Sequence, residues 1–327
     1  MERRRLIVLA GGAVVWTFSA RAQQGDVRRI SALMHYAESD PDAQARIAGL
    51  LSGLRERGWV SGRNAEIIIH WTGGDPDFLQ REVAGSVAAA PHVIFAAGSP
   101  AVALLRRATQ TIPVVFVGVV DPVNAGFVVS MARPGGNVTG FVQFEYSVSG
   151  KWLEILKEIA PGTTRVAVIW DPTIAAGGGQ LRAIQSAAPS FGVEISPVDV
   201  RDANEIKRAL ATFAQQSNGG LVVTGGSLAL VHRELILTLA AEHRLPAVYF
   251  TRSFIPDGGL ISYGVDLVEH FRSAAAYIDR ILRGEQPLDL PVQAPTKYEL
   301  VLNLKTARTM GFAVPATLLA RADEVVE

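Results

Sequence analysis

Apolar and polar residues alternate along this chain in blocks that predict a repeated strand–helix unit. Residues 93–97 and 114–120 are continuous apolar runs of strand length, which are typical of a parallel sheet covered by helices on both faces. Between them, Gly-Ser-Pro at residues 98–100 predicts a turn, an N-cap at Ser99 and the start of a short helix. A further short helix is expected after the acidic turn at Asp121.

The same unit is repeated ahead of this stretch. Residues 28–35 and 64–71 read as strands. Each is followed by an Asp-Pro pair, at residues 40–41 and 75–76, that predicts the start of a helix. Units of similar length in succession predict a parallel, doubly wound sheet.

A second series of strand–helix units begins after the break at residues 135–137 and a short extended piece at 138–144. Its strands are predicted at residues 165–170, 193–198, 221–224 and 247–250. Its helices are predicted at residues 149–159, from a Gly-Gly-Gly turn at 177–179 to Phe191, at 204–215, and at 227–243 with Ser227 as the cap. Two similar α/β lobes in one chain predict a ligand cleft between them.

The C-terminal part contains too little regular structure for a third lobe. Its elements are predicted at residues 260–263, 267–282, 288–295, 298–303, 304–310 and 316–322. These pieces must complete the first two lobes, so the chain is expected to cross between lobes near Gly140, Ser262 and Pro291. The predicted fold is therefore α/β, with two doubly wound Rossmann-like lobes joined by a three-crossing hinge. The first lobe is assigned to residues 27–140 plus 264–291 and the second to 141–263 plus 292–327.

The N-terminus has the organisation of a secretory signal peptide. Residues 2–5 are Glu-Arg-Arg-Arg, residues 6–18 are an apolar run too short to span a bilayer, and Ala20-Arg21-Ala22 is a small-x-small cleavage pattern. We expect residues 1–22 to be removed after Ala22 and the mature protein to be periplasmic. The arginine pair ahead of Leu6 admits the twin-arginine route as well as the Sec route; an uncleaved anchor is the alternative.

Composition excludes several classes of function. The 327 residues carry 31 basic and 31 acidic side chains, and this balance gives no electrostatic case for binding nucleic acid. The chain contains no cysteine, which excludes thiolate metal sites, disulfides and a cysteine nucleophile. We expect neither a metal nor a cofactor.

The turn at Gly98-Ser99 is the first candidate for a binding site. It places a hydroxyl and free backbone N–H groups at the carboxyl edge of the sheet, where open α/β folds bind ligands and a helix N-terminus favours an anion. Asp121 follows the next strand at the same edge, so the pair would suit a zwitterion such as an amino acid. The alternative is that Ser99 and Asp121 are only helix caps.

The sequence also resembles a known family. Seven ordered motifs, spread over nearly the whole mature chain, carry the resemblance: residues 53–64 (GLRERGWVSGRN), 111–116 (TIPVVF), 121–123 (DPV), 132–140 (ARPGGNVTG), 259–264 (GLISYG), 295–300 (PTKYEL) and 318–324 (LLARADE). They resemble the exported substrate-binding proteins of ABC importers, in the group typified by tryptophan and tyrosine binders. The resemblance implies a type I periplasmic-binding-protein fold that closes on a small-molecule ligand and delivers it to a membrane permease. We expect a monomer and no enzymatic activity.

In such a fold, loops at the carboxyl ends of strands in both lobes hold the ligand. On the first lobe the resemblance points to Gly98, Ser99 and Asp121, and to His35 and Tyr36 at the end of the first strand. The candidates on the second lobe are Trp170, Asp171, Ser227, Phe250 and Arg252. Trp170 would stack on the ligand or belong to the core, and Arg252 would hold a carboxylate or form an ion pair.

The same resemblance exposes a difference at Ser227. Amino-acid binders of this type place an acid near the corresponding turn to hold the ammonium group, whereas this chain has Gly225-Gly226-Ser227 there.

An enzyme is the main rival function, but the chain has no Gly-x-Ser-x-Gly elbow, no His-Glu-x-x-His and no P-loop lysine. A ligand-sensing partner of a membrane receptor is the other alternative.

Overall fold

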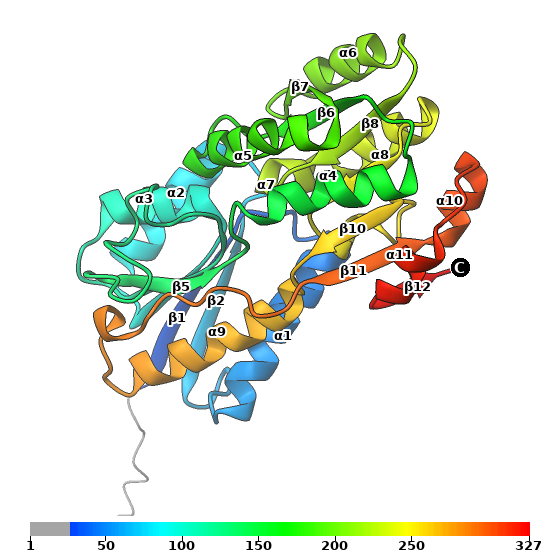
Figure 1. The fold of residues 1–327 in the computed structure, drawn as a ribbon. Coiled ribbons are helices and arrows are strands. Elements are labelled where there is room, and N and C mark those ends of the chain that lie inside the picture. The colour runs from blue at the N-terminus through cyan, green and yellow to red at the C-terminus, as the bar shows by residue number, and fades with distance from the viewer. Residues whose placement is uncertain (1–26) are drawn as a thin grey trace, which may run out of the picture.

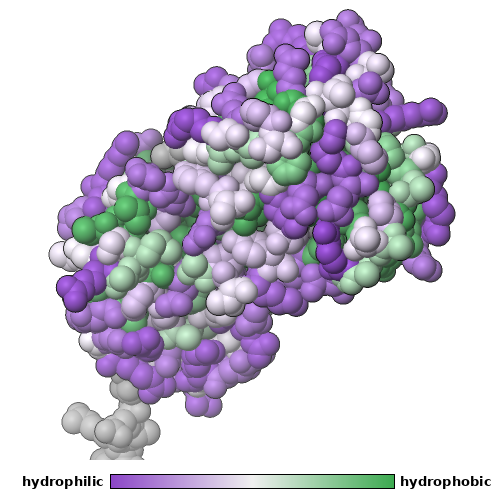
Figure 2. Space-filling model, viewed as in Figure 1, coloured by the Kyte–Doolittle hydropathy of each residue, from purple (hydrophilic) through white to green (hydrophobic). Residues whose placement is uncertain are grey.

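The computed structural model describes residues 27–327, which fold into two α/β lobes (Figure 1). The predicted signal peptide lies outside the described residues. No helix within 27–327 is both long enough and apolar enough to cross a bilayer. On the face seen in Figure 2, hydrophilic residues cover most of the surface and hydrophobic residues gather in smaller groups.

The first lobe is built on a parallel five-stranded sheet in the order β2-β1-β3-β4-β5. Its strands are β1 (Arg28–Met34), β2 (Ala65–Trp71), β3 (Val93–Ala97), β4 (Val114–Val119) and β5 (Val138–Val142). Its helices are α1 (Pro41–Glu56), α2 (Pro76–Ala88), α3 (Ser99–Ala108) and, from much later in the chain, α9 (Leu267–Leu282).

The continuous apolar sequence of β3 is explained by helices on both faces of this sheet. Phe95 packs in the same core as α1 and α9, whereas its neighbours Ile94 and Ala96 pack in the core beneath α2 and α3. Helices α1 and α9 lie side by side because α1 has glycines at the contact. A Cβ on Gly53 would lie 2.6 Å from the carbonyl oxygen of Arg272.

The second lobe is built on a seven-stranded sheet in the order β12-β11-β10-β9-β8-β6-β7. Its strands are β6 (Arg165–Trp170), β7 (Glu194–Asp199), β8 (Gly219–Val223), β9 (Ala247–Tyr249), β10 (Ile261–Gly264), β11 (Glu299–Asn303) and β12 (Glu324–Val326). Its helices are α4 (Val148–Ile159), α5 (Ala175–Phe191), α6 (Ala203–Phe213), α7 (Ser227–Val231), α8 (Arg233–Glu242), α10 (Leu304–Met310) and α11 (Ala316–Arg321). Short 3-10 turns, η1 (Arg252–Phe254) and η2 (Pro287–Asp289), complete the chain, and β11 runs antiparallel to β10.

The chain passes between the two sheets three times. It leaves the first sheet after β5, returns after β10 to form α9, and leaves again between Gln293, which pairs with Phe141, and β11. The two-lobe α/β fold with a three-crossing hinge is therefore confirmed. Each crossing lies a few residues beyond the predicted Gly140, Ser262 and Pro291, and the lobe boundaries themselves stay a prediction.

Four local predictions were wrong. Residues 177–179 lie inside α5 and not in a turn, because Gly177 packs where a Cβ would lie 1.7 Å from the carbonyl oxygen of Asp171. The helix predicted at 227–243 is divided at His232 into α7 and α8. The segment after Asp121 forms turns without a helix, and β12 was not expected.

Candidate functional site

Each sheet has a switch point, where the chain connections that leave two neighbouring strands diverge. The switch points of the two sheets face each other. In the first sheet β1 lies between β2 and β3, so the chain connections diverge at the carboxyl ends of β1 and β3. In the second sheet β6 lies between β7 and β8, and the same divergence occurs at the ends of β6 and β8. Open α/β sheets bind ligands at such points. The residues that follow these four strands therefore define the candidate site.

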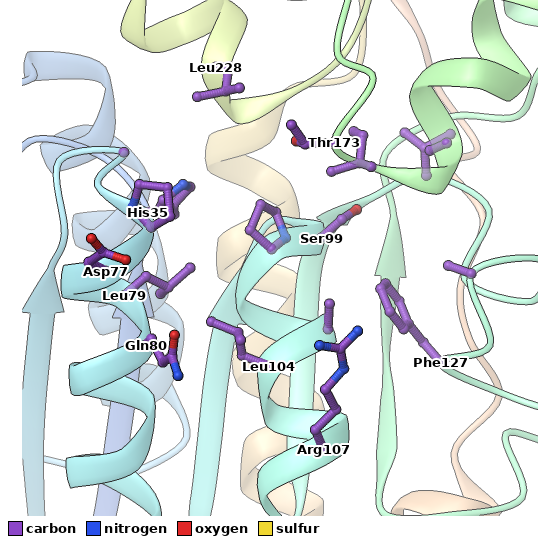
Figure 3. Close-up of a pocket in the computed structure, with 18 residues that line it drawn as sticks. His35, Asp77, Leu79, Gln80, Ser99, Leu104, Arg107, Phe127, Thr173 and Leu228 are labelled. Carbon is purple, nitrogen blue, oxygen red and sulfur yellow. The ribbon is translucent and has the colours of Figure 1, made fainter. Parts of the chain in front are cut away.

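A cavity of about 490 Å³ lies between these ends and is lined by both lobes (Figure 3). In the view of Figure 3, Leu228 and Thr173 of the second lobe stand above His35 and Ser99 of the first. The first lobe contributes most of the lining: His35, Gly74, Pro76, Asp77, Leu79, Gln80, Ser99, Pro100, Ala103, Leu104, Arg107, Val120, Ala125 and Phe127. The second lobe contributes Thr173, Ile174, Ala176 and Leu228.

Ser99 faces the cavity from the first turn of α3. The N-cap position belongs to Gly98, whose φ of 91° suits glycine, and no side-chain cap bond is formed. The expectation that Ser99 is the cap was therefore wrong. Ser99 is 8% exposed, and its hydroxyl forms no side-chain cap bond and has no hydrogen-bond partner within residues 27–327. A hydroxyl that faces the cavity without a protein partner is available to a ligand, next to the unpaired N–H groups of the helix.

His35 lies beside this turn, because the β1–β3 pairing that joins Met34 to Ala97 continues towards His35 and Gly98. Its ring is 3% exposed, and burial lowers the pKa of His35 to about 4 against a smaller opposing effect of Asp75. His35 is thus neutral at pH 7. Nδ1 lies 2.9 Å from Thr72 Oγ1, which itself donates to the carbonyl oxygen of Met34 at 3.5 Å. Nδ1 is thereby occupied by Thr72, whose hydroxyl can donate to it or accept from it, and Nε2 is the ring nitrogen left for a ligand.

One face of α3 forms a long wall of the cavity. Pro100, Ala103, Leu104 and Arg107 line it at positions i, i+3, i+4 and i+7, the spacing of residues on one side of a helix. Leu79 of α2 and Phe127, which follows the Asp121 turn, widen this wall with further apolar surface. The sequence analysis did not single out these residues. The helical spacing within the predicted helix was the signal that could have found them.

On the second lobe the predicted residues are mainly structural. Asp171 is buried and accepts hydrogen bonds from Thr173 N at 2.9 Å and Thr173 Oγ1 at 2.5 Å. Burial raises the pKa of Asp171, and the bonds from Thr173 oppose that rise. Trp170 is half-buried against the core, and Phe250 lies beneath the turn at Gly225. None of these three lines the cavity, whereas the neighbouring Thr173 does.

The remaining predicted residues lie away from the cavity wall. The ring of Tyr36 is covered by the guanidinium of Arg46, 5.0 Å from its centroid, and lines a separate cavity of about 240 Å³. Asp121 accepts from Asn124 N at 3.1 Å, so it stabilises its own turn, which is the alternative that the sequence analysis left open. Arg252 is paired with Glu299 and Glu324.

Contacts between the lobes hold this arrangement. Arg233 of α8 lies 2.6 Å from Asp42 and 3.7 Å from Asp40, both at the start of α1. The buried Arg46 of α1 donates to Ser253 Oγ of the second lobe at 2.6 Å. Ser227 reaches across to the first lobe, where its hydroxyl lies 2.8 Å from the place of a Cβ on Gly98. The cavity therefore lies between lobes that are in direct contact.

Comparisons with known proteins agree with this geometry. A family model described as ABC transporter substrate binding protein matches residues 35–326. A tyrosine-binding protein of Clostridioides difficile is 24% identical over 262 residues, which cover 80% of this chain and 75% of that protein.

Two solved structures share the fold. A conserved domain protein from Vibrio cholerae is 26% identical, with a TM-score of 0.85 and coverage of 91% of this chain and 99% of that one. An ABC domain from Streptococcus pneumoniae in complex with L-Trp is 22% identical, with the same TM-score and the same coverage. The second likeness, at this identity, shows the fold alone.

Proposed function

The chain belongs to the ABC transporter substrate-binding protein family, and from this membership we propose that it is an exported protein that captures a small ligand between its lobes and delivers it to the permease of an ABC importer. The family is one of binding proteins and not of enzymes. Export rests on the sequence of residues 1–22, and delivery rests on the family.

The observation that carries the proposal is the cavity shared by the two switch points. It combines an unpartnered hydroxyl on Ser99 with a neutral His35 and apolar walls, and the second lobe closes it with Ile174 and Leu228. A mostly apolar cavity with a few convergent polar groups is typical of small-ligand sites. The three crossings supply the hinge by which the lobes would open and close.

For the ligand we propose a small molecule with a carboxylate, such as an amino acid or a related acid. Ser99 and the first N–H groups of α3 would accept that carboxylate, since a helix N-terminus favours an anion. The names of relatives that bind tyrosine or L-Trp support this class of ligand.

Native mass spectrometry of protein purified from its source organism tests the proposal. We expect one bound small molecule per chain, released on denaturation and identified by fragmentation. Small-angle scattering should then show a larger radius of gyration for the stripped protein than for the protein reloaded with that molecule. The proposal would be contradicted if the purified protein carried no bound molecule and no small molecule from a host extract changed its radius of gyration.

A further inference from the structure

The charges around the cavity define the class of ligand more narrowly. Resting on the binding function proposed above, we infer that the ligand is a carboxylic acid with an extended apolar body and without an ammonium group.

The anionic end of the ligand is placed by Ser99 and the N-terminus of α3. Ser99 Oγ faces the cavity from the N-terminus of α3, a helix of 10 residues, and has no partner among the described residues. The positive end of the helix dipole and the unpaired N–H groups of the first turn favour a carboxylate there. His35 lines the same end of the cavity but is neutral, so it adds one hydrogen-bonding ring nitrogen and no charge.

An ammonium group has no buried counter-charge in this cavity. Of the lining residues that the structure describes, Asp77 is the one with a carboxylate, and it is exposed to solvent in the first turn of α2. Asp171, behind the second-lobe turn, does not line the cavity and already accepts two bonds from Thr173. The second lobe closes over the Ser99 end with Ile174 and Leu228. A buried cation without a paired anion is costly.

A neutral hydroxyl fits where the ammonium does not. Because Nδ1 of His35 is bonded to Thr72, Nε2 is left for the ligand, and a ligand hydroxyl can pair with it as donor or as acceptor. An ammonium would bring three hydrogens and a full charge to the same place. A hydroxyl next to the carboxylate therefore matches the polar end better than an amine does.

The apolar body is placed by the face of α3. Ala103 and Leu104 continue the cavity from Ser99 towards Arg107, and Leu79 and Phe127 line the same space. Arg107 lies eight positions after Ser99 in the sequence, which corresponds to about 12 Å along a helix axis. An aromatic or long aliphatic body would cover this apolar surface, whereas a short polar acid would leave the surface in contact with water.

Two series of isosteres test the inference by calorimetry at pH 7. The first comprises L-tyrosine, 3-(4-hydroxyphenyl)lactate and 3-(4-hydroxyphenyl)propionate, which share the ring and the carboxylate and differ by amine, hydroxyl or hydrogen. The second is the corresponding indole series with L-tryptophan. We expect both acids without an amine to bind at least tenfold more tightly than the amino acid in at least one series. Equal or tighter binding of the amino acids, or no binding by any of the six compounds, would overturn the inference.

A designed variant separates this inference from the proposed function. Leu228→Asp places a carboxylate in the second-lobe wall, and it should raise the affinity for L-tyrosine at least tenfold while it weakens the binding of the propionate. Leu319→Asp on α11 is the matched control, because it adds the same charge at an exposed site. Melting curves verify that both variants fold. If the amino acids bind the unaltered protein more tightly than the acids without an amine, and binding compacts the protein in scattering, the inference is overturned. The proposed function would then still stand.

Discussion

Ser227 of the second lobe lies directly against Gly98 of the first, with its hydroxyl 2.8 Å from where a Cβ on Gly98 would be. The two turns follow equivalent strands, β8 and β3, of the two sheets. Ser227 is not the side-chain cap that the sequence suggested, and neither is Ser99 beside Gly98, since no cap bond forms at α7 or α3. The contact between Ser227 and Gly98 is what brings the two switch points together around one cavity.

Replacing Gly98 with alanine should block this contact. The new Cβ would collide with Ser227, and the φ of 91° would also be strained for alanine. We expect at least tenfold weaker binding of the native ligand by calorimetry. Gly58→Ala is the matched control, because Gly58 has the same φ of 91° and open space around its Cβ position. Equal losses of affinity in the two variants would show that the lobe contact is unimportant.

Ser99→Ala should weaken binding without lowering stability. The loss of a hydrogen bond to a charged group costs about 1.5–3 kcal/mol, or about ten- to a hundredfold in Kd. The melting temperature should not change, because Ser99 forms no cap bond. Asp202→Ala gives the opposite pattern as a control, since Asp202 caps α6 away from the cavity. A lower melting temperature with unchanged affinity for Ser99→Ala would assign a structural role to its hydroxyl.

Arg233→Gln should favour the open state. Arg233 is 12% exposed and lies 2.6 Å from Asp42 across the lobe boundary. Loss of this pair should weaken ligand binding by about 1–2 kcal/mol, roughly five- to thirtyfold. Scattering of the unliganded variant should show a larger radius of gyration than the parent protein.

Arg201→Gln is the control for this prediction, because Arg201 pairs with Asp199 within its own turn and is mostly exposed. It should change neither the affinity nor the radius. If Arg233→Gln behaves like Arg201→Gln, the ion pair does not contribute to closure.

The pKa of His35 predicts a pH dependence. Because the folded-state pKa of His35 is about 4 and lies below the ordinary value of 6.5, the unfolded chain binds a proton first as the pH falls. Stability should therefore decrease below about pH 6.5, and His35 should account for about 2 kcal/mol of the decrease between pH 7 and pH 5. His35→Gln should reduce this decrease in denaturant titrations at the two pH values.

Ligand affinity should respond differently to pH. His35 stays neutral down to about pH 4, so its ring brings no charge to the cavity at pH 5 and the affinity should stay the same between pH 7 and pH 5. If the stability of His35→Gln falls between pH 7 and pH 5 as steeply as that of the parent protein, His35 is not held neutral in the folded state.

Local signals predicted the elements of the fold well. Asp40 and Asp75 cap α1 and α2 as their Asp-Pro sequences indicated, and the apolar run of β3 has the bounds that it predicted. These features depend on neighbours in the sequence. The two-lobe architecture followed because successive units of similar length can pack in few ways.

The site depends on contacts that local sequence does not encode. Gly177 belongs to a helix because it packs against the backbone of Asp171, and a run of three glycines alone indicated a turn. Arg252 and Asp121 are occupied by Glu299, Glu324 and Asn124, partners that only the folded chain reveals. Leu104 and Arg107 looked like ordinary helix positions until α3 was placed against the cavity.

A crystal structure of the protein purified from its source organism, without added ligand, tests the central claim most directly. The account predicts electron density for one small molecule between Ser99 and Leu228, with an acidic group within hydrogen-bond distance of Ser99 Oγ. A molecule bound elsewhere, with only water in the cavity between the lobes, would contradict it.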